Sequence, residues 1–257
     1  MKISIAQFKS ELGAVEENFS IAARLIEAAQ NSDVILLPEL WSTGYYPTPV
    51  ENFADKDGRR TKEFLCAAAQ KFSVNIIGGS VIVVGGSVIV DSYGQIFNRC
   101  LVANRRGEIV ATYDKTHLFS FAGEDKVFRA GDKISTVELD GVKCGLAICY
   151  DLRFPEFIRK IALAGVEIIF IPAAWSLKRL TPRQILTKAR AIENQIFVAF
   201  ANSSGKSEII NPLGESLAES GRGEEILSAE INLNDRAEVI KTMNLLGDRN
   251  PDVDFFH

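Results

Sequence analysis

Histidine is almost absent from this 257-residue sequence, which contains only His117 and the terminal His257. A metal site built from several histidines is therefore not expected. Catalysis by a Cys–His or Ser–His pair would have to rest on His117, which we interpret as a structural hydrogen-bonding residue. If the protein is an enzyme, its base is expected to be a carboxylate or a lysine.

The sequence also lacks the features of proteins that bind nucleic acids, span membranes or are exported. Its formal net charge is -4, so there is no excess of Lys and Arg to bind phosphates. No apolar run reaches the roughly 18 residues of a membrane span. The chain enters a strand at once, over residues 2–8, which argues against a signal peptide. The four cysteines contain no Cys-x-x-Cys pair, so we expect neither disulfides nor zinc, and a cytoplasmic location.

No linker rich in Pro, Ser or Gly interrupts the chain, and we predict one domain over residues 1–257. Buried or alternating apolar runs predict strands, and apolar residues at helical spacing predict helices. The predicted strands are 2–8, 33–37, 74–90, 97–103, 109–113, 142–148, 166–171, 196–202, 208–210 and 225–231. The predicted helices are 15–30, 61–72, 153–164, 183–194 and 233–243.

The strand predicted over residues 142–148 ends abruptly at Cys149. A helix is expected to follow, with Asp151 as its N-cap and Pro155 in its first turn. A cysteine at such a turn would meet the free N–H groups of the next helix, which favour a thiolate and later an oxyanion. The alternative is a structural cysteine, because unpaired cysteines are among the most buried residues. These residues alone leave both interpretations open.

Two further charged residues lie just past strand ends, where α/β folds place ligands. Glu39 follows the strand 33–37 among apolar and aromatic residues, where loss of water contacts makes a carboxylate a stronger base. Lys115 follows the strand 109–113 and would suit a fixed cation for developing negative charge. In both cases a solvated loop residue is the more ordinary alternative. Glu124 lies in a long loop, of a kind that often carries function.

Two nearly identical copies of Gly-Gly-Ser-Val-Ile-Val stand in tandem over residues 78–90. They predict either a hairpin that turns at Gly85-Gly86 or a strand lengthened by a local duplication. Two copies are too few for a solenoid, which needs about three or more units. A serine–lysine amidase built on Ser80 or Ser87 is disfavoured, because the sequence lacks the longer Gly- and Ser-rich segment of such enzymes.

Three blocks together resemble the nitrilase superfamily of carbon–nitrogen hydrolases. They are Leu37-Pro38-Glu39 with Gly44-Tyr45, the segment 113–119 around Lys115, and the segment 145–156 around Cys149. Similarity extends to residues 5–7 and 188–195 and covers nearly the whole chain. The run Cys-Tyr-Asp-Leu-Arg-Phe-Pro is most similar to the ω-amidase-like branch.

This resemblance implies an α/β fold, a four-layer α-β-β-α sandwich that usually forms a homodimer or larger homo-oligomer through helices near the cysteine. It implies Cys149 as the nucleophile, Glu39 as the general base and Lys115 as the cation for the oxyanion. Glu124 would orient the substrate and Lys115. The other implied substrate-positioning residues are Tyr45, Tyr150 (through its N–H), Ala174 and Trp175. Neither a metal nor an organic cofactor is implied.

The implied reaction is hydrolysis of a small linear amide to a carboxylic acid and ammonia through a thioester. An ω-amide of a dicarboxylic acid is one candidate substrate. An anionic substrate would need a cationic partner, for which Lys178, Arg179 and Arg153 are the candidates. For Arg153 we favour a structural ion pair with a nearby carboxylate such as Glu156 or Glu193 over this role.

Two departures from the family pattern bear on these expectations. The second copy of the repeat looks like an insertion that leaves the catalytic residues alone. Many relatives have Glu-Trp-Pro and a later His-Trp pair where this chain has Ala174, Ser176 and Thr181-Pro182. This segment lines the substrate pocket in the family, so the identity of the amide stays open. N-carbamoyl-amine hydrolysis, nitrile hydrolysis and a catalytically silent binding or scaffold protein remain alternatives.

Overall fold

Alternating side chains in the first of two β-sheets serve two separate cores. In β2 (Val34–Leu36), Val34 and Leu36 pack into the core between the sheets. Ile35 and the following Leu37 pack instead into a second core beneath helices. Because successive side chains of a strand point to opposite faces, one short apolar run contributes to both.

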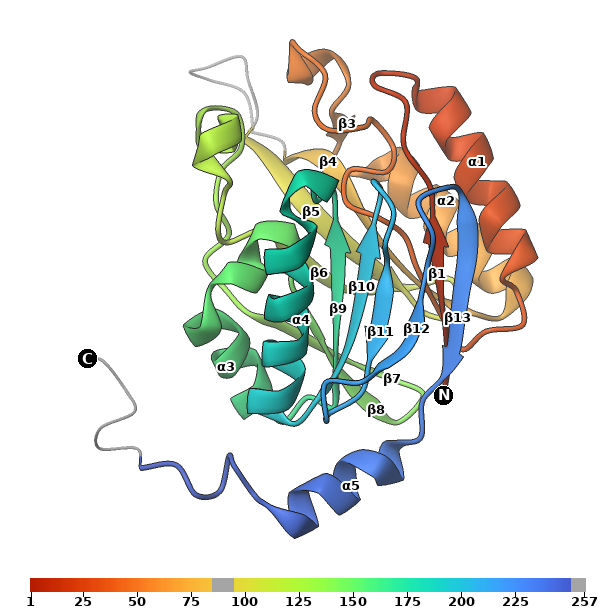
Figure 1. Cartoon of the computed structure of the whole chain (residues 1–257). Coiled ribbons are helices and arrows are strands. Elements are labelled where there is room, and N and C mark those ends of the chain that lie inside the picture. Colours follow the sequence, from red (N-terminus) through yellow and green to blue (C-terminus); the bar gives the residue numbers. More distant parts are fainter. Residues whose placement is uncertain (85–94, 251–257) are drawn as a thin grey trace.

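The computed structural model describes residues 1–84 and 95–250 (Figure 1). The first sheet has the order β13-β1-β2-β4-β5-β6, with β3 paired to β4. Its other strands are β1 (Lys2–Gln7), β3 (Asp55–Lys56), β4 (Asn75–Val84), β5 (Gln95–Ala103), β6 (Ile109–Asp114) and β13 (Glu225–Glu230). The strands β1, β2 and β4 run parallel, and β13, β5 and β6 are antiparallel to their neighbours.

The second sheet has the order β12-β11-β10-β9-β8-β7. Its strands are β7 (Ser135–Leu139), β8 (Val142–Leu146), β9 (Ile168–Ala173), β10 (Phe197–Asn202), β11 (Glu208–Ile210) and β12 (Ser216–Glu219). The three central strands β8, β9 and β10 are parallel, so their carboxyl ends meet at one edge. Short 3-10 helices lie in the connections: η1 (Val50–Asn52), η2 (Ser120–Ala122), η3 (Glu124–Lys126), η4 (Cys149–Arg153) and η5 (Leu177–Arg179).

Helices cover the outer face of each sheet (Figure 1). The first sheet is covered by α1 (Val15–Ala28) and α2 (Arg59–Phe72), and the second by α3 (Pro155–Leu163) and α4 (Leu180–Asn194). The helix α3 lies so close to β8 that a Cβ atom on Gly145 would come within 2.4 Å of Ile161 Cγ2. After β13, α5 (Leu233–Thr242) lies at the bottom of the sandwich. This arrangement confirms the predicted α/β four-layer α-β-β-α sandwich in a single domain.

The structure differs from the sequence prediction in several elements. The edge strands β7 and β12 were not expected, because few of their side chains are buried and the apolar pattern is weak. The helix α4 starts at Leu180, three residues before the predicted start at Arg183. The first copy of the tandem repeat forms part of β4. The proposed turn at Gly85-Gly86 and Ser87 lie outside the described residues.

Candidate active site

Four segments that follow strands bring chemically active groups to one end of the sandwich. Glu39 follows β2, Lys115 follows β6, Cys149 follows β8 and Ala174 follows β9. These residues are distant in sequence and come together because the two sheets pack face to face. The predicted catalytic residues Glu39, Lys115 and Cys149 therefore share one site, together with Glu124 from η3.

Lys115 lies buried between two carboxylates. Its Nζ is 2.7 Å from Glu39 Oε1 and 2.8 Å from Glu124 Oε2. Burial alone would lower the pKa of Lys115, but Glu39, Cys149 and Glu124 together raise it above its usual range. Burial also raises the pKa of Glu124, against the opposing effect of Lys115. Lys115 is consequently a permanent cation in a region without bulk water, where its field is strong.

Glu39 is held by donors from three different elements. Besides Lys115, Asn98 Nδ2 donates to Glu39 Oε1 at 2.8 Å, and the Ala174 N–H donates to Oε2 at 2.8 Å. The sequence analysis did not identify Asn98, a fully buried amide in β5. The available signal was an uncharged amide, next to Arg99, within the otherwise apolar strand predicted over residues 97–103. These contacts fix the orientation of the carboxylate.

Glu124 is fixed in a similar way. The Phe119 N–H donates to its Oε2 at 2.8 Å, and Tyr45 Oη donates to its Oε1 at 2.8 Å. Burial and the nearby carboxylates raise the pKa of Tyr45, which keeps the phenol protonated and able to donate. Glu124 thus connects Lys115 to the loop that contains Phe119. This supports the proposed orienting role of Glu124.

Cys149 stands at a sharp turn between β8 and α3, as the first residue of η4. Its backbone is in the left-handed region, with φ at +44°, which is unfavourable for residues other than glycine and recurs at functional sites. Asp151 does not cap α3, whose N-cap is Phe154. Asp151 instead accepts from the Ile148 N–H at 2.8 Å and from Tyr113 Oη at 2.7 Å. A short 3-10 turn therefore precedes the helix, and Asp151 secures that turn.

The sequence-based expectation for His117 is consistent with this geometry. Its N–H donates to Asp151 Oδ1 at 2.9 Å, and its Nδ1 lies 2.8 Å from the same oxygen. The ring stacks on Phe154 with centroids 3.7 Å apart. These contacts join the segment after Lys115 to the cysteine turn.

The surroundings of Cys149 favour the thiol in the resting protein. Burial raises the pKa of Cys149 well above its usual range, and Glu39 and Glu124 raise it further. Lys115 and the Ala174 N–H act in the opposite direction but do not overcome the rise. The expectation that helix N–H groups would favour a thiolate is therefore wrong for the resting state. A thiol of this kind needs a base to take its proton before it can act as a nucleophile, and Glu39 is the carboxylate with the largest effect on the pKa of Cys149.

A pocket of about 230 Å³ opens onto Cys149. It is lined by Tyr45, Phe119, Cys149, Tyr150, Arg153, Ala174, Trp175, Ser176 and Arg179. Five residues were predicted to position the substrate, and all of them except Glu124 are in this lining. Glu39, Lys115 and Glu124 lie buried behind it.

Two arginines line the pocket without an acidic partner among the described residues. The Arg153 guanidinium lies 4.7 Å from the Trp175 ring. In the described part of the chain it forms no ion pair with Glu156 or Glu193, contrary to expectation, and Glu193 pairs with Arg190 instead. The Arg179 guanidinium lies 5.2 Å from the rings of both Phe119 and Phe121. Aromatic faces hold a cation while leaving its hydrogen-bond donors free.

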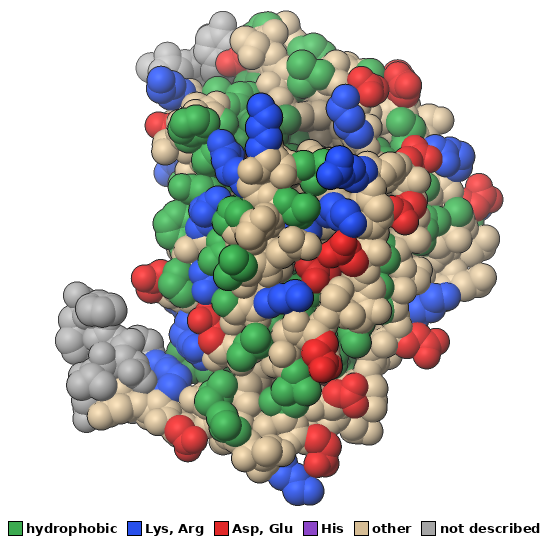
Figure 2. Space-filling view, in the orientation of Figure 1, with side chains coloured by type: hydrophobic (Ala, Val, Ile, Leu, Met, Phe, Trp, Pro, Cys, Tyr) green, Lys and Arg blue, Asp and Glu red, His purple; other side chains and the backbone are tan. Residues whose placement is uncertain are grey.

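Lys178, the third candidate cation, is not in the pocket lining. Figure 2 shows Lys and Arg side chains gathered on the upper part of the face that contains the beginning of α4. Such a concentration of positive charge attracts small anions toward this end of the molecule.

A model of the carbon–nitrogen hydrolase family matches residues 2–241 of this chain. The chain belongs to the carbon–nitrogen hydrolase family. Among its relatives, 2-oxoglutaramate amidase from Bacillus subtilis (strain 168) is 41% identical, over 98% of both chains. Omega-amidase NIT2-A from Xenopus laevis is 29% identical, over 98% of this chain and 96% of the relative.

The fold of this carbon–nitrogen hydrolase also has close structural relatives. The crystal structure of a carbon–nitrogen hydrolase from Helicobacter pylori G27 matches with a TM-score of 0.89 and 25% identity, over 99% of this chain and 96% of that one. Within residues 1–84 and 95–250, no helix of this carbon–nitrogen hydrolase is long and apolar enough to cross a membrane. The same residues contain no cluster of His, Cys, Asp and Glu suited to a metal ion.

Proposed function

We propose that this carbon–nitrogen hydrolase releases ammonia from a small linear amide whose other end is a carboxylate, such as an ω-amide of a dicarboxylic acid. The observation that carries the proposal is one small pocket that joins Cys149 to Arg153 and Arg179. The amidase and omega-amidase names of the relatives support it. A carboxylate would provide the acidic partner that both arginines lack among the described residues.

In the first half-reaction, Glu39 takes the thiol proton while the sulfur of Cys149 bonds to the amide carbon. The carbonyl oxygen gains negative charge, which Lys115 Nζ and the Tyr150 N–H stabilise. Tyr150 is the second residue of η4, so its N–H has no partner within that helix. Glu39 then gives the proton to the nitrogen as the C–N bond breaks, which releases ammonia and leaves a thioester.

In the second half-reaction, water replaces ammonia. Glu39 takes a proton from the water, and the resulting hydroxide bonds to the thioester carbon. The C–S bond breaks, the carboxylic acid leaves, and the proton returns from Glu39 to the sulfur of Cys149. The enzyme ends in its starting state. Because Lys115 stays cationic throughout, it stabilises the oxyanion in both halves.

Ammonia release from a panel of small anionic and neutral amides, an N-carbamoyl amine and a nitrile tests the proposal. Ammonia release should be fastest with succinamate, glutaramate or 2-oxoglutaramate, and slower with neutral amides of equal length. Substitution R179A or R153A should raise KM for the anionic amides by about tenfold or more, because each removes a charge-assisted hydrogen bond. KM for the neutral amides should stay within about twofold.

The control for the arginines is K178A, since Lys178 lies outside the pocket lining. Equal activity on neutral and anionic amides would contradict the carboxylate part of the proposal. Faster release from an N-carbamoyl amine or a nitrile would favour those members of the family. No turnover of any compound, with a Cys149 no more reactive than the other cysteines, would favour a silent binding or scaffold protein.

We also propose that the protein works as a cytoplasmic homodimer. The four free cysteines support a reducing location. Two large apolar side chains on the outer face of α4 are exposed, Ile185 at 62% and Ile192 at 46%, and a second copy would bury them. Light scattering should give twice the mass of one chain for the wild type and a single-chain mass for the I185D/I192D variant. A single-chain mass for the wild type would contradict the dimer.

A further inference from the structure

We propose that Asn202 is a positioning residue, which holds the pocket wall so that the Ala174 N–H faces Glu39 and both arginines face the substrate. The roles of Glu39 and the arginines rest on the proposed function. Asn202 itself does not line the pocket. It would act through Trp175, the residue that follows Ala174.

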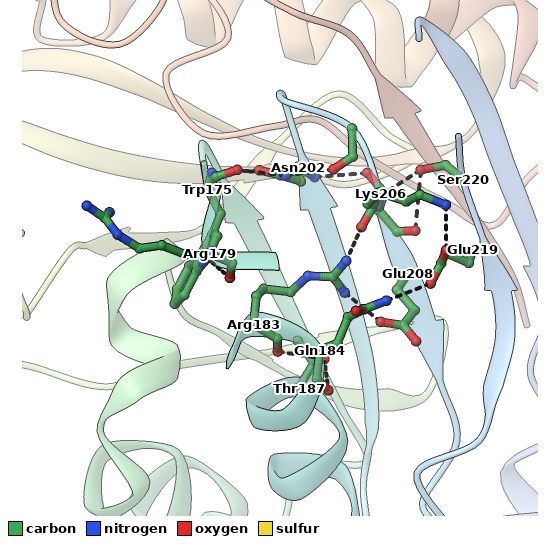
Figure 3. A network of polar contacts seen from close by, with 12 residues as sticks. Trp175, Arg179, Arg183, Gln184, Thr187, Asn202, Lys206, Glu208, Glu219 and Ser220 are labelled. Carbon is green, nitrogen blue, oxygen red and sulfur yellow. Dashed lines mark hydrogen bonds and ion pairs between the residues drawn. The ribbon is translucent and has the colours of Figure 1, made fainter. Parts of the chain in front are cut away.

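The Asn202 side chain forms hydrogen bonds with both the N–H and the carbonyl of Trp175 (Figure 3). Its Oδ1 accepts from the Trp175 N–H at 2.6 Å, and its Nδ2 donates to the Trp175 carbonyl at 3.0 Å. Asn202 is the last residue of β10 and is 1% exposed. Since β9 and β10 are parallel neighbours, the end of β10 lies directly beside the point where the chain leaves β9.

Asn202 is itself held firmly. Its Nδ2 also donates to the Gly205 carbonyl at 2.7 Å, and its own N–H donates to Ser207 Oγ at 2.9 Å. Ser207 Oγ in turn donates to Gln7 Oε1 at 2.7 Å, which connects this turn to the first sheet. A buried amide with its donors and acceptor satisfied from rigid elements specifies one geometry. The two hydrogen bonds from Asn202 therefore fix the backbone position of Trp175.

Three functional contacts depend on the placement of Trp175. The preceding Ala174 N–H donates to Glu39 and also acts on Cys149. The indole Nε1–H donates to the Arg179 carbonyl at 2.9 Å, and the Trp175 ring supports Arg153. Figure 3 shows the Arg179 guanidinium pointing away from Arg183 and Glu208, which form a separate ion pair. One buried amide thereby links the base to both candidate carboxylate-binding cations.

The test compares N202A with S220A in the full-length protein. Ser220 belongs to the same buried network, where its Oγ accepts from the Ser207 N–H at 2.7 Å, but it does not contact Trp175. Both variants lose buried hydrogen bonds, so both are expected to unfold at lower urea concentration. N202A alone should lower kcat by about tenfold or more and raise KM for anionic amides, because small misplacements of positioned groups are costly.

Alkylation of Cys149 by iodoacetamide, followed over pH by peptide mass spectrometry, gives a readout independent of any substrate. The Ala174 N–H lowers the pKa of Cys149, so its displacement should raise that pKa. Less thiolate then exists at a given pH, and the rate profile of N202A should move to higher pH. An unmoved profile, with kcat and KM equal to those of S220A, would show that Asn202 is merely structural.

Two further variants keep the inference falsifiable if N202A does not fold. N202D retains the acceptor for the Trp175 N–H but, as a buried acid, can donate to only one of the two carbonyls, so its kcat should lie between wild type and N202A. W175F keeps the two backbone hydrogen bonds to Asn202 and loses the indole donor to the Arg179 carbonyl, so KM should rise more for anionic amides than for neutral ones. An unchanged KM in W175F would overturn the link to Arg179. A wild type inactive on every amide would refute the proposed function, while the alkylation profiles would still decide the role of Asn202.

Discussion

Replacing Cys149 with alanine should reduce ammonia release by about 10⁴-fold or more, because no other group in the pocket can form the thioester. The lining contains no second thiol, and Cys100 and Cys144 are fully buried in the core between the sheets. Rates are best measured by coupled ammonia detection under saturating substrate. Intact mass after rapid acid quench should show an added acyl group in the wild type and none in C149A.

The matched control is C66A. Cys66 lies on α2, outside the pocket lining, and burial raises the pKa of its thiol. Its loss should leave kcat and KM unchanged. Full activity in C149A would exclude the mechanism, and loss of activity in C66A would indicate general damage by thiol substitution.

Replacing Glu39 with glutamine should separate thiolate formation from turnover. The kcat should fall by about 10³-fold, since a glutamine neither protonates the leaving nitrogen nor activates water. The Glu39 charge raises the pKa of Cys149, so its removal should lower that pKa. The thiolate then forms at lower pH, and the alkylation profile of E39Q should move to lower pH while ammonia release nearly stops.

E208Q serves as the control for E39Q. Glu208 is also fully buried and ion-paired, with Arg183 at 2.5 Å, but it lies outside the pocket lining. Its substitution should reduce stability, since it leaves a buried guanidinium without a charged partner, and should leave the Cys149 profile unmoved. A profile of E39Q that moved to higher pH would mean that Glu39 assists thiolate formation more than it opposes it, contrary to the expected sign.

Local patterns were sufficient for most of the helices and strands, whereas the four-layer arrangement was implied by the resemblance to a family. The strand before Glu39 and the strand that ends before Cys149 were each predicted from residues adjacent in sequence. The structure contains both, as β2 and β8. The edge strands β7 and β12 were not predicted, because a strand exposed along one side needs few apolar residues. The misplaced cap at Asp151 has a related cause, since sequence spacing does not distinguish a 3-10 turn from the first turn of an α-helix.

The site could be predicted in part. Glu39, Lys115 and Cys149 each follow a strand, and that position in an α/β fold already suggests a ligand site. The contacts of Asn98 and Asn202 could not be predicted from the sequence. Each amide lies in a largely apolar strand, and its partner, Glu39 or Trp175, belongs to a segment distant in sequence. The predicted ion pair of Arg153 with Glu156 or Glu193 was wrong for the same reason. Trp175, which supports Arg153, arrives from the following strand of the sheet.

The sequence by itself determined which residue types stand at the strand ends, and therefore which chemistry the protein can perform. The tertiary structure alone decided the charge state of those groups. Cys149 is a resting thiol because burial and the charges of Glu39 and Glu124 raise its pKa, and Lys115 stays a cation because the same two carboxylates outweigh the opposite effect of burial on its pKa. Desolvation and Coulomb interactions depend on distances in space, and only the packing of two sheets brings these groups together.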